Sequence, residues 1–202
     1  ELLRALSGVT GVYVPSLYRA EFDGDRLSGI VPIDDAPPVV EKRTVADLAD
    51  WPYPKNQLVP LTEVIHDRLN VEVFRGCTRG CRFCQAGMIY RPLRERTPEE
   101  VLAGARALLA NTGYDEISLV SLSSTDHSQI DGIVAALRGE FGDDLGISLP
   151  STRVDSFSVD VALACSPRKK HSMTFAPEAG SQRLRNAVSK VVDEEDLLRA
   201  SR

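Results

Sequence analysis

From residue 70 to the end of the chain, short β-rich runs alternate with amphipathic stretches. The predicted strands cover 70–76, 115–124, 146–153 and 171–180, and the predicted helices cover 97–113, 126–142, 155–165 and 181–190. Strands that alternate with helices imply a parallel sheet with right-handed crossovers. The fold class is therefore α/β, either an open doubly wound sheet or a partial (β/α) barrel with four βα units visible. In both architectures chemistry collects at the carboxyl ends of the strands.

The helix at 97–113 has start and stop signals of its own. Thr97 is a suitable N-cap, Pro98 suits the first helical position, and Glu100 completes a capping box. Gly113 provides the stop. The following helix places a set of branched and aliphatic side chains on one face: Ile130, Ile133, Val134 and Leu137. Near the end of the chain, Asp193 is predicted to cap a further helix, with Asp196 at its third position.

Residues 1–69 have a different pattern, in which Pro and Gly recur and helical periodicity is absent. A short strand is predicted at 11–18, followed by a turn-rich stretch at 21–29. Because repeated Pro and Gly break helices and central strands, we predict the tail of a preceding domain plus a linker, with a second domain at 70–202. The opening ELLRALSG is interpreted as the end of a helix closed by Gly8, and the chain stops inside another helix. We therefore expect a fragment of a longer protein, with roughly two more barrel strands after Arg202.

Charge, composition and the pattern of apolar residues argue against three classes of protein. The 202 residues carry a formal net charge of −5, so the chain as a whole is not a nucleic-acid-binding polycation. No apolar run approaches the ~20 residues that a membrane span needs. No basic segment followed by an apolar export signal is present. We expect a cytoplasmic protein without a membrane partner.

Three of the four cysteines lie within eight residues, in the stretch RGCTRGCRFCQAG at 75–87. In a cytoplasmic chain such a group more often binds metal or acts in catalysis than forms disulfides. Three thiolates leave a fourth ligand position open, and a [4Fe–4S] cube held in this way keeps one iron for an exogenous ligand. The alternative is a zinc site completed by His66, His127, His171 or Cys165. Cys165 ends the apolar run VALAC and is better explained as a small buried residue.

The spacing C-x-x-x-C-x-aromatic-C, directly after the first predicted strand, resembles the signature of the radical SAM superfamily. Together with TGYDEISLVSLSSTDHS, LPSTRVDSFS and TFAPEAGSQRLRNAVSK, it resembles a subgroup of uncharacterised radical SAM proteins. That subgroup usually carries an N-terminal cobalamin-binding-type domain and is related to the tRNA and ribosomal-protein methylthiotransferases.

The resemblance implies a partial barrel with a [4Fe–4S] cluster whose open iron binds S-adenosylmethionine (SAM). It implies reductive cleavage of SAM to a 5′-deoxyadenosyl radical that modifies an unknown substrate, with RNA or a ribosome-linked molecule as the suggested class. A flavodoxin- or ferredoxin-type electron donor is implied as a partner, and cobalamin is raised as a further cofactor.

Four residues of the cysteine stretch carry roles over from this resemblance. Cys77, Cys81 and Cys84 match the cluster ligands. Phe83 matches the aromatic residue that packs near the adenine of SAM.

Four further residues match at the ends of the later strands. Ser121 and Ser123 lie where the family meets the methionyl ammonium of SAM, although the usual Gly-Gly-Glu is absent. Arg153 is assigned to a carboxylate, and Glu178 to ribose hydroxyls or the ammonium. The alternative for Glu178 is to cap the helix that follows it.

Six arginines surround the cysteines: Arg75, Arg79, Arg82, Arg91, Arg94 and Arg96. They form either a basic entrance for an anionic substrate such as RNA, or a solvated loop paired with Glu95, Glu99 and Glu100. The second function class is accordingly a zinc-stabilised RNA-binding module without redox chemistry. His127 opens a predicted helix and is interpreted as a surface or capping residue rather than a base.

Overall fold

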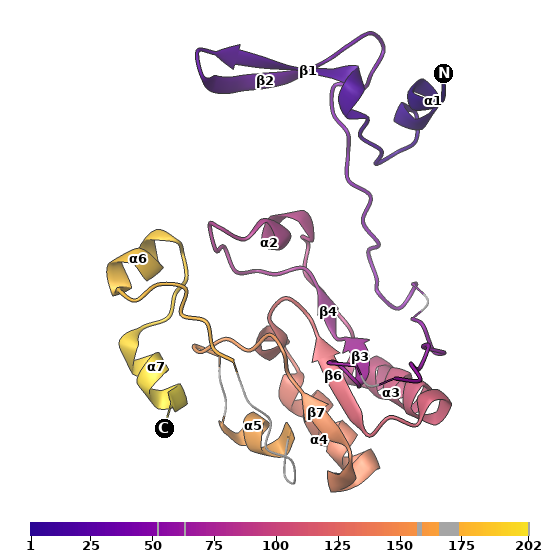
Figure 1. Ribbon diagram of the computed structural model, residues 1–202, viewed down its shortest axis with the longest axis vertical. Helices are drawn as coiled ribbons and strands as arrows, with labels where there is room; N and C mark the ends of the chain where they lie inside the picture. Colours follow the sequence, from indigo (N-terminus) through magenta and orange to yellow (C-terminus); the bar gives the residue numbers. More distant parts are fainter. Residues whose placement is uncertain (52, 63, 157–158, 166–173, 202) are drawn as a thin grey trace. The chain divides into compact units, whose positions relative to one another are not determined.

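The computed structural model describes residues 1–51, 53–62, 64–156, 159–165 and 174–201. The chain divides into two compact units, Glu1–Ala46 and Asp47–Arg202 (Figure 1). This division falls inside the region predicted to be a domain tail plus linker. No described helix combines the length and apolar character that a membrane span requires.

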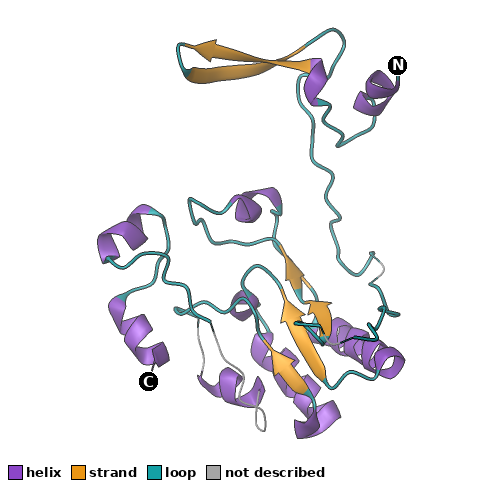
Figure 2. Ribbon diagram, in the orientation of Figure 1, coloured by secondary structure: helices purple, strands orange, loops and turns teal. Residues whose placement is uncertain are grey.

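The first unit holds a short helix and a two-stranded hairpin (Figure 2). Helix α1 spans Leu2–Ser7 and ends before Gly8, as predicted. Strands β1 (Tyr18–Asp23) and β2 (Arg26–Pro32) pair in antiparallel orientation. Gly24 lies in the two-residue connection with φ 59°, a backbone conformation that glycine adopts without strain.

This hairpin corrects two predictions for the N-terminal region. The strand predicted at 11–18 was wrong over most of its length, because the 3₁₀ helix η1 occupies Pro15–Leu17 and β1 begins only at Tyr18. The stretch 21–29, predicted as turns, forms most of the hairpin. Gly24 and Asp25 form the connection, and glycine at its first position favours a tight reversal.

The second unit is built on a three-stranded parallel sheet with the order β3-β6-β7. Strand β3 spans Leu69–Glu72, β6 spans Glu116–Val120 and β7 spans Gly146–Ser148. In register, Leu69 pairs with Ile117, and Ile117 pairs with Ile147. The predicted parallel α/β sheet is therefore confirmed for its first three strands.

Two helices connect these strands and a third follows the last of them (Figure 1). Helix α3 (Pro98–Thr112) packs on β3 and on α4 (Ile130–Phe141), and α5 (Val159–Cys165) packs on α4 and β7. The apolar faces of these elements form one core, which includes Leu69, Val71, Leu108, Ile117, Leu119, Ile133, Leu137 and Ile147.

The capping box predicted for α3 is confirmed. The Thr97 hydroxyl accepts from the Glu100 amide at 3.3 Å, and the Thr97 amide donates to the Glu100 carboxylate at 2.7 Å. Gly113 ends the helix in the left-handed conformation, φ 74°. A similar exchange occurs at the start of α7 (Glu194–Ser201), where the Asp196 amide donates to Asp193 at 2.8 Å.

Three predicted strands differ in the structure. The strand predicted at 146–153 ends at Ser148, well before Arg153. The run at 70–76 breaks after Glu72, and the short strand β4 (Phe74–Arg75) pairs instead with β5 (Arg94–Glu95) in antiparallel orientation. Of the fourth predicted strand, 171–173 lie outside the described residues and 174–180 form no strand. Pro177 lacks a backbone donor and Glu178 has φ 69°, so neither fits a strand ladder. Helix α6 (Gln182–Ala187) follows, and the barrel stays a prediction.

Part of the proline-rich connector belongs to the second unit. Leu48 is fully buried, and its carbonyl accepts from Arg96 Nη1 at 3.1 Å. The Tyr53 hydroxyl donates to the Asn70 carbonyl and accepts from the Glu72 amide. This segment therefore lies against β3, while the predicted boundary at 69/70 and the preceding domain stay predictions.

Candidate functional site

The cysteine loop leaves the end of β4 and returns as β5, so the short β4–β5 pair forms its base. Within it, the short helix α2 spans Gln85–Ile89. Cys84 is the N-cap residue of α2, and its sulfur accepts from the Gly87 amide at 3.4 Å. The loop therefore begins at the carboxyl end of the first strand, the edge where α/β proteins place their chemistry.

The three cysteines of the loop all have free thiols. Gly87 lies beside two of them, because a methyl group at that position would be 3.7 Å from Cys84 Sγ and 4.0 Å from Cys77 Cβ. Cys81 is nearly buried, and its sulfur lies 4.0 Å from Arg153 Nη1. The structure thus brings Cys77 and Cys84 together around Gly87 and directs Cys81 toward Arg153, in the segment that follows β7.

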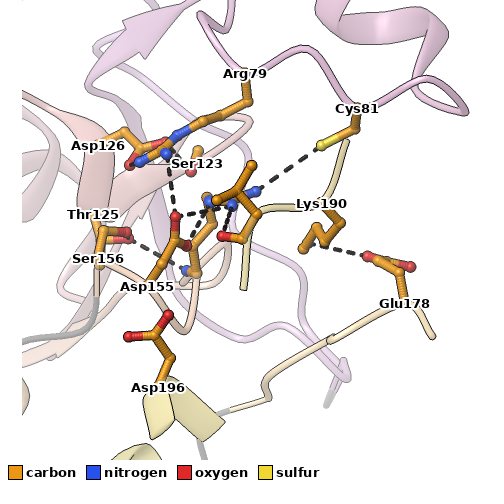
Figure 3. A network of polar contacts seen from close by, with 12 residues as sticks. Arg79, Cys81, Ser123, Thr125, Asp126, Asp155, Ser156, Glu178, Lys190 and Asp196 are labelled. Atoms are coloured by element: carbon orange, nitrogen blue, oxygen red, sulfur yellow. Dashed lines mark hydrogen bonds and ion pairs between the residues drawn. The ribbon is translucent and has the colours of Figure 1, made fainter. Parts of the chain in front are cut away.

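A network of charged contacts ties this loop to the ends of β6 and β7 (Figure 3). Arg79 donates from Nε to Asp126 at 2.8 Å and from Nη1 to Asp155 at 3.1 Å. The Ser123 hydroxyl also donates to Asp126, at 2.7 Å. Burial by itself would raise the pKa of Asp126, but the hydrogen bonds from Arg79 and Ser123 outweigh it and hold the pKa below its usual value. Asp126 is therefore ionised at neutral pH.

A cavity of about 480 Å³ opens beside the base of the loop, within the size range of small-molecule sites. Its lining comes from the ends of β3, β4 and β6 and from the loop: Glu72, Phe74, Arg75, Gly76, Tyr90, Val120, Ser121 and Leu122. Arg75 and Glu72 form a two-pronged ion pair at 2.8 and 2.7 Å on its wall.

Comparison with known proteins agrees with this geometry. The family model described as the Radical SAM superfamily matches residues 71–202, from the first strand of the sheet onward. The chain belongs to the radical SAM superfamily. The uncharacterized protein MJ0966 of Methanocaldococcus jannaschii is 30% identical over 189 residues. The aligned region covers 93% of this chain but 38% of that relative, so this chain spans less than half of its length.

Proteins of the radical SAM superfamily typically bind a [4Fe–4S] cluster and SAM. Among the described residues, no three or more His, Cys, Asp or Glu side chains converge as the ligands of a single ion. Cys77, Cys81 and Cys84 lie in one loop with free thiols, and thiolates are the ligands that such a cluster takes on its irons. The family match begins at residue 71. The preceding cobalamin-binding-type domain, cobalamin itself and the link to methylthiotransferases therefore stay predictions.

The residues assigned to SAM lie in contrasting surroundings. Ser121 lines the cavity, whereas Ser123 is buried and its hydroxyl bonds to Asp126. Phe83 is 55% exposed. Arg153 is buried and makes a forked contact with Asp155, at 2.8 and 3.0 Å. The roles of all four toward SAM stay predictions.

Glu178 pairs with Lys190 at 3.2 Å (Figure 3). The alternative that Glu178 caps the next helix was wrong, because Ser181 is the N-cap residue of α6 and accepts from the Leu184 amide. Its assignment to SAM stays a prediction.

The zinc alternative gains no support from the described residues. His127 was predicted to be a surface or capping residue. It is not at the surface, because it is buried beside Phe74 and its Nε2 bonds to the Arg96 carbonyl at 3.0 Å. Its Nδ1 accepts from the amide of Gln129, the N-cap residue of α4, at 3.0 Å. His66 lies 3.0 Å from an Arg68 nitrogen. His171 lies outside the described residues.

Cys165 lies in the core, and burial raises the pKa of its thiol to about 11, although the nearby Arg138 charge acts in the opposite direction. At pH 8 its thiolate fraction should be about 100-fold lower in the folded chain than in the unfolded one. We expect iodoacetamide to label Cys165 at least that much more slowly before than after addition of urea, measured by mass spectrometry. Equal rates would contradict this. Because the folded chain holds this proton more tightly than the unfolded chain, the raised pKa adds to the free energy of unfolding. That contribution is fully present below about pH 9 and is lost as the pH rises toward 11.

Neither interpretation of the six arginines holds for the whole group. Arg75 and Arg79 pair with acids at the strand ends, and Arg96 is buried over the Tyr53 ring at 5.4 Å. Two of the three acids expected as partners make other contacts: Glu100 completes the capping box, and Glu95 accepts from the Ser128 amide at 2.8 Å. Half of the predicted basic entrance is therefore engaged in contacts within the chain.

Sequence reasoning missed Asp126 and Asp155 as members of the site. Both follow predicted strands, and the rule that chemistry collects at the carboxyl ends of strands could have drawn attention to them. Their partner Arg79 lies 47 and 76 residues away along the chain. Only the parallel order of the strands brings these residues together.

Proposed function

We propose that this chain forms the cofactor-binding part of a radical SAM enzyme. When bound, the [4Fe–4S] cluster supplies one electron that cleaves SAM to methionine and a 5′-deoxyadenosyl radical able to abstract hydrogen from a substrate. The observation that carries the proposal is the C-x-x-x-C-x-x-C loop at the carboxyl edge of a parallel sheet, in a chain whose residues 71–202 match the superfamily.

In this proposal Cys77, Cys81 and Cys84 hold three irons, and the fourth iron is left for SAM. The cavity beside the loop is the candidate place for SAM, since Ser121 lines it and offers a hydroxyl to the methionyl ammonium. The Glu72–Arg75 pair on the same wall adds polar groups that can orient a charged ligand. The electron would come from a donor protein of flavodoxin or ferredoxin type.

The substrate is proposed only as far as the site allows. Three of the six arginines are not free to bind RNA. Arg75 and Arg79 pair with acids, and Arg96 is buried. RNA and ribosome-linked substrates, like the cytoplasmic location, therefore stay predictions from the resemblance alone.

The test is to purify and reconstitute the chain without oxygen, and then to measure iron, sulfide and zinc per chain. We expect a brown protein with close to four irons and four sulfides per chain, the content of a [4Fe–4S] cluster. With dithionite and SAM it should form 5′-deoxyadenosine, detected by chromatography. A colourless protein that retains one zinc ion per chain would overturn the proposal in favour of the zinc-stabilised module.

A further inference from the structure

The charged network beside the cysteine loop ends at a cluster ligand. Asp155 lies between two guanidinium groups, since Arg79 donates to its Oδ2 at 3.1 Å while Arg153 donates to both its oxygens. The remaining nitrogen of Arg153, Nη1, lies 4.0 Å from Cys81 Sγ. Figure 3 shows Arg79, Asp155 and Cys81 gathered in this network.

Arg153 is held rigidly in this position. Its side chain is 8% exposed, and Nη2 makes a further contact with the Val191 carbonyl at 3.4 Å. Its backbone amide donates to the Thr125 hydroxyl at 3.3 Å. Because a guanidinium is planar, the two bonds to Asp155 fix the direction of Nη1, which points at the sulfur of Cys81.

We propose that Arg153 is a positioning residue for the cluster, aimed by Asp155, which donates to the sulfur of Cys81 and raises the reduction potential of the cluster. This inference rests on the proposed function, because it requires that Cys81 hold an iron. It departs from the assignment of Arg153 to a SAM carboxylate, since the fork that would grip such a carboxylate is already bonded to Asp155.

The physical reason is the change in charge on reduction. The reduced cluster carries one more negative charge, and a donor on a ligand sulfur stabilises that charge. Burial strengthens this effect because a low local dielectric screens it less than water does. Arg79 and Arg153 together balance Asp126 and Asp155, so loss of the Arg153 charge leaves one carboxylate charge uncompensated close to Cys81.

The test compares Arg153→Met with the wild-type chain, both loaded with cluster. Their reduction potentials are measured by titration with dithionite and mediators, followed by electron paramagnetic resonance. We expect the reduction equilibrium of Arg153→Met to shift about tenfold toward the oxidised form, a potential lower by about 59 mV for one electron. Arg153→Lys keeps the positive charge but not the forked contact with Asp155. Its reduction potential should therefore lie between those of the wild type and Arg153→Met. This variant replaces Arg153→Met in the test if the Met variant does not fold.

Arg106→Met is the matched control. Arg106 makes the same kind of fork, with Glu140, but on the outer surface between α3 and α4. Its potential should equal that of the wild type. Potentials that are the same in all variants would overturn the inference, as would a shift of equal size in Arg106→Met.

A second measurement needs no cluster and separates the two proposals. In the metal-free chain, Arg153→Met should change the rate at which iodoacetamide labels Cys81, because the substitution removes a contact that shields this thiol and also the positive charge beside it. If the wild-type chain never binds iron and sulfide, the proposed function fails. An unchanged labelling rate beside a wild-type chain that does load its cluster counts against Arg153 alone.

Discussion

Replacing Cys81 by alanine is expected to reduce 5′-deoxyadenosine formation to background. Cys81 is the middle thiol of the loop and the least exposed of the three. Its loss would leave a cluster with two protein thiolates. Mutation of a residue that only supports a metal ligand lowers metal affinity or activity by about 10–100-fold. Removal of the ligand itself should therefore lower 5′-deoxyadenosine formation by more than about 100-fold. The measurements are iron and sulfide per chain, and 5′-deoxyadenosine after reduction with dithionite in the presence of SAM.

Cys165→Ala is the matched control for this experiment. It also removes one thiol, but from the apolar core rather than from the loop. Its iron content and 5′-deoxyadenosine yield should stay at the wild-type level. Continued 5′-deoxyadenosine formation by Cys81→Ala would show that this thiol does not hold the cluster, and an equal loss in Cys165→Ala would point to a folding defect instead.

Local signals predicted the elements whose structure is set locally. The helix at 97–113 was predicted from its cap, its first-position proline and its terminal glycine, and all three act as expected. The alternation of strands and helices predicted parallel pairing, which the registers of β3, β6 and β7 show. Each of these features depends on residues within one or two turns or on a general rule of α/β connection.

Features set by distant partners were not predictable in the same way. The segment 70–76 was predicted to be one continuous strand, yet its Phe74 pairs with Glu95, on the far side of the cysteine loop. No periodicity in the sequence encodes that pairing. The cysteine spacing identified the loop, but the partners of Arg79 could not be read from neighbours in the sequence. The acids closest in sequence were predicted instead, and the fold uses Asp126 and Asp155.

Gly76→Ala is the second substitution expected to have a large effect. Gly76 has φ 96°, a backbone conformation that residues other than glycine rarely adopt. A methyl group there would lie 2.6 Å from the Pro92 carbonyl oxygen, 2.8 Å from that of Tyr90 and 3.0 Å from Leu93 Cα. All three are backbone atoms, so the overlap cannot be relieved by turning a side chain. The returning arm of the cysteine loop would have to move away from its start.

The expected cost exceeds about 2 kcal/mol, because an unfavourable φ and steric overlap each contribute about 1–3 kcal/mol. If the loop unfolds together with the sheet, this cost should lower the urea concentration at the midpoint of unfolding. If the loop opens by itself, the cost should appear as loss of bound iron with an unchanged midpoint. Gly80→Ala is the control, since Gly80 lies in the same loop with nothing within 4 Å of its Cβ position and no left-handed φ. A Gly76→Ala chain that matches Gly80→Ala in both measurements would contradict the close approach at Gly76. Loss of bound iron in Gly76→Ala alone would mean that the loop must close tightly at its base before its three cysteines can hold a cluster.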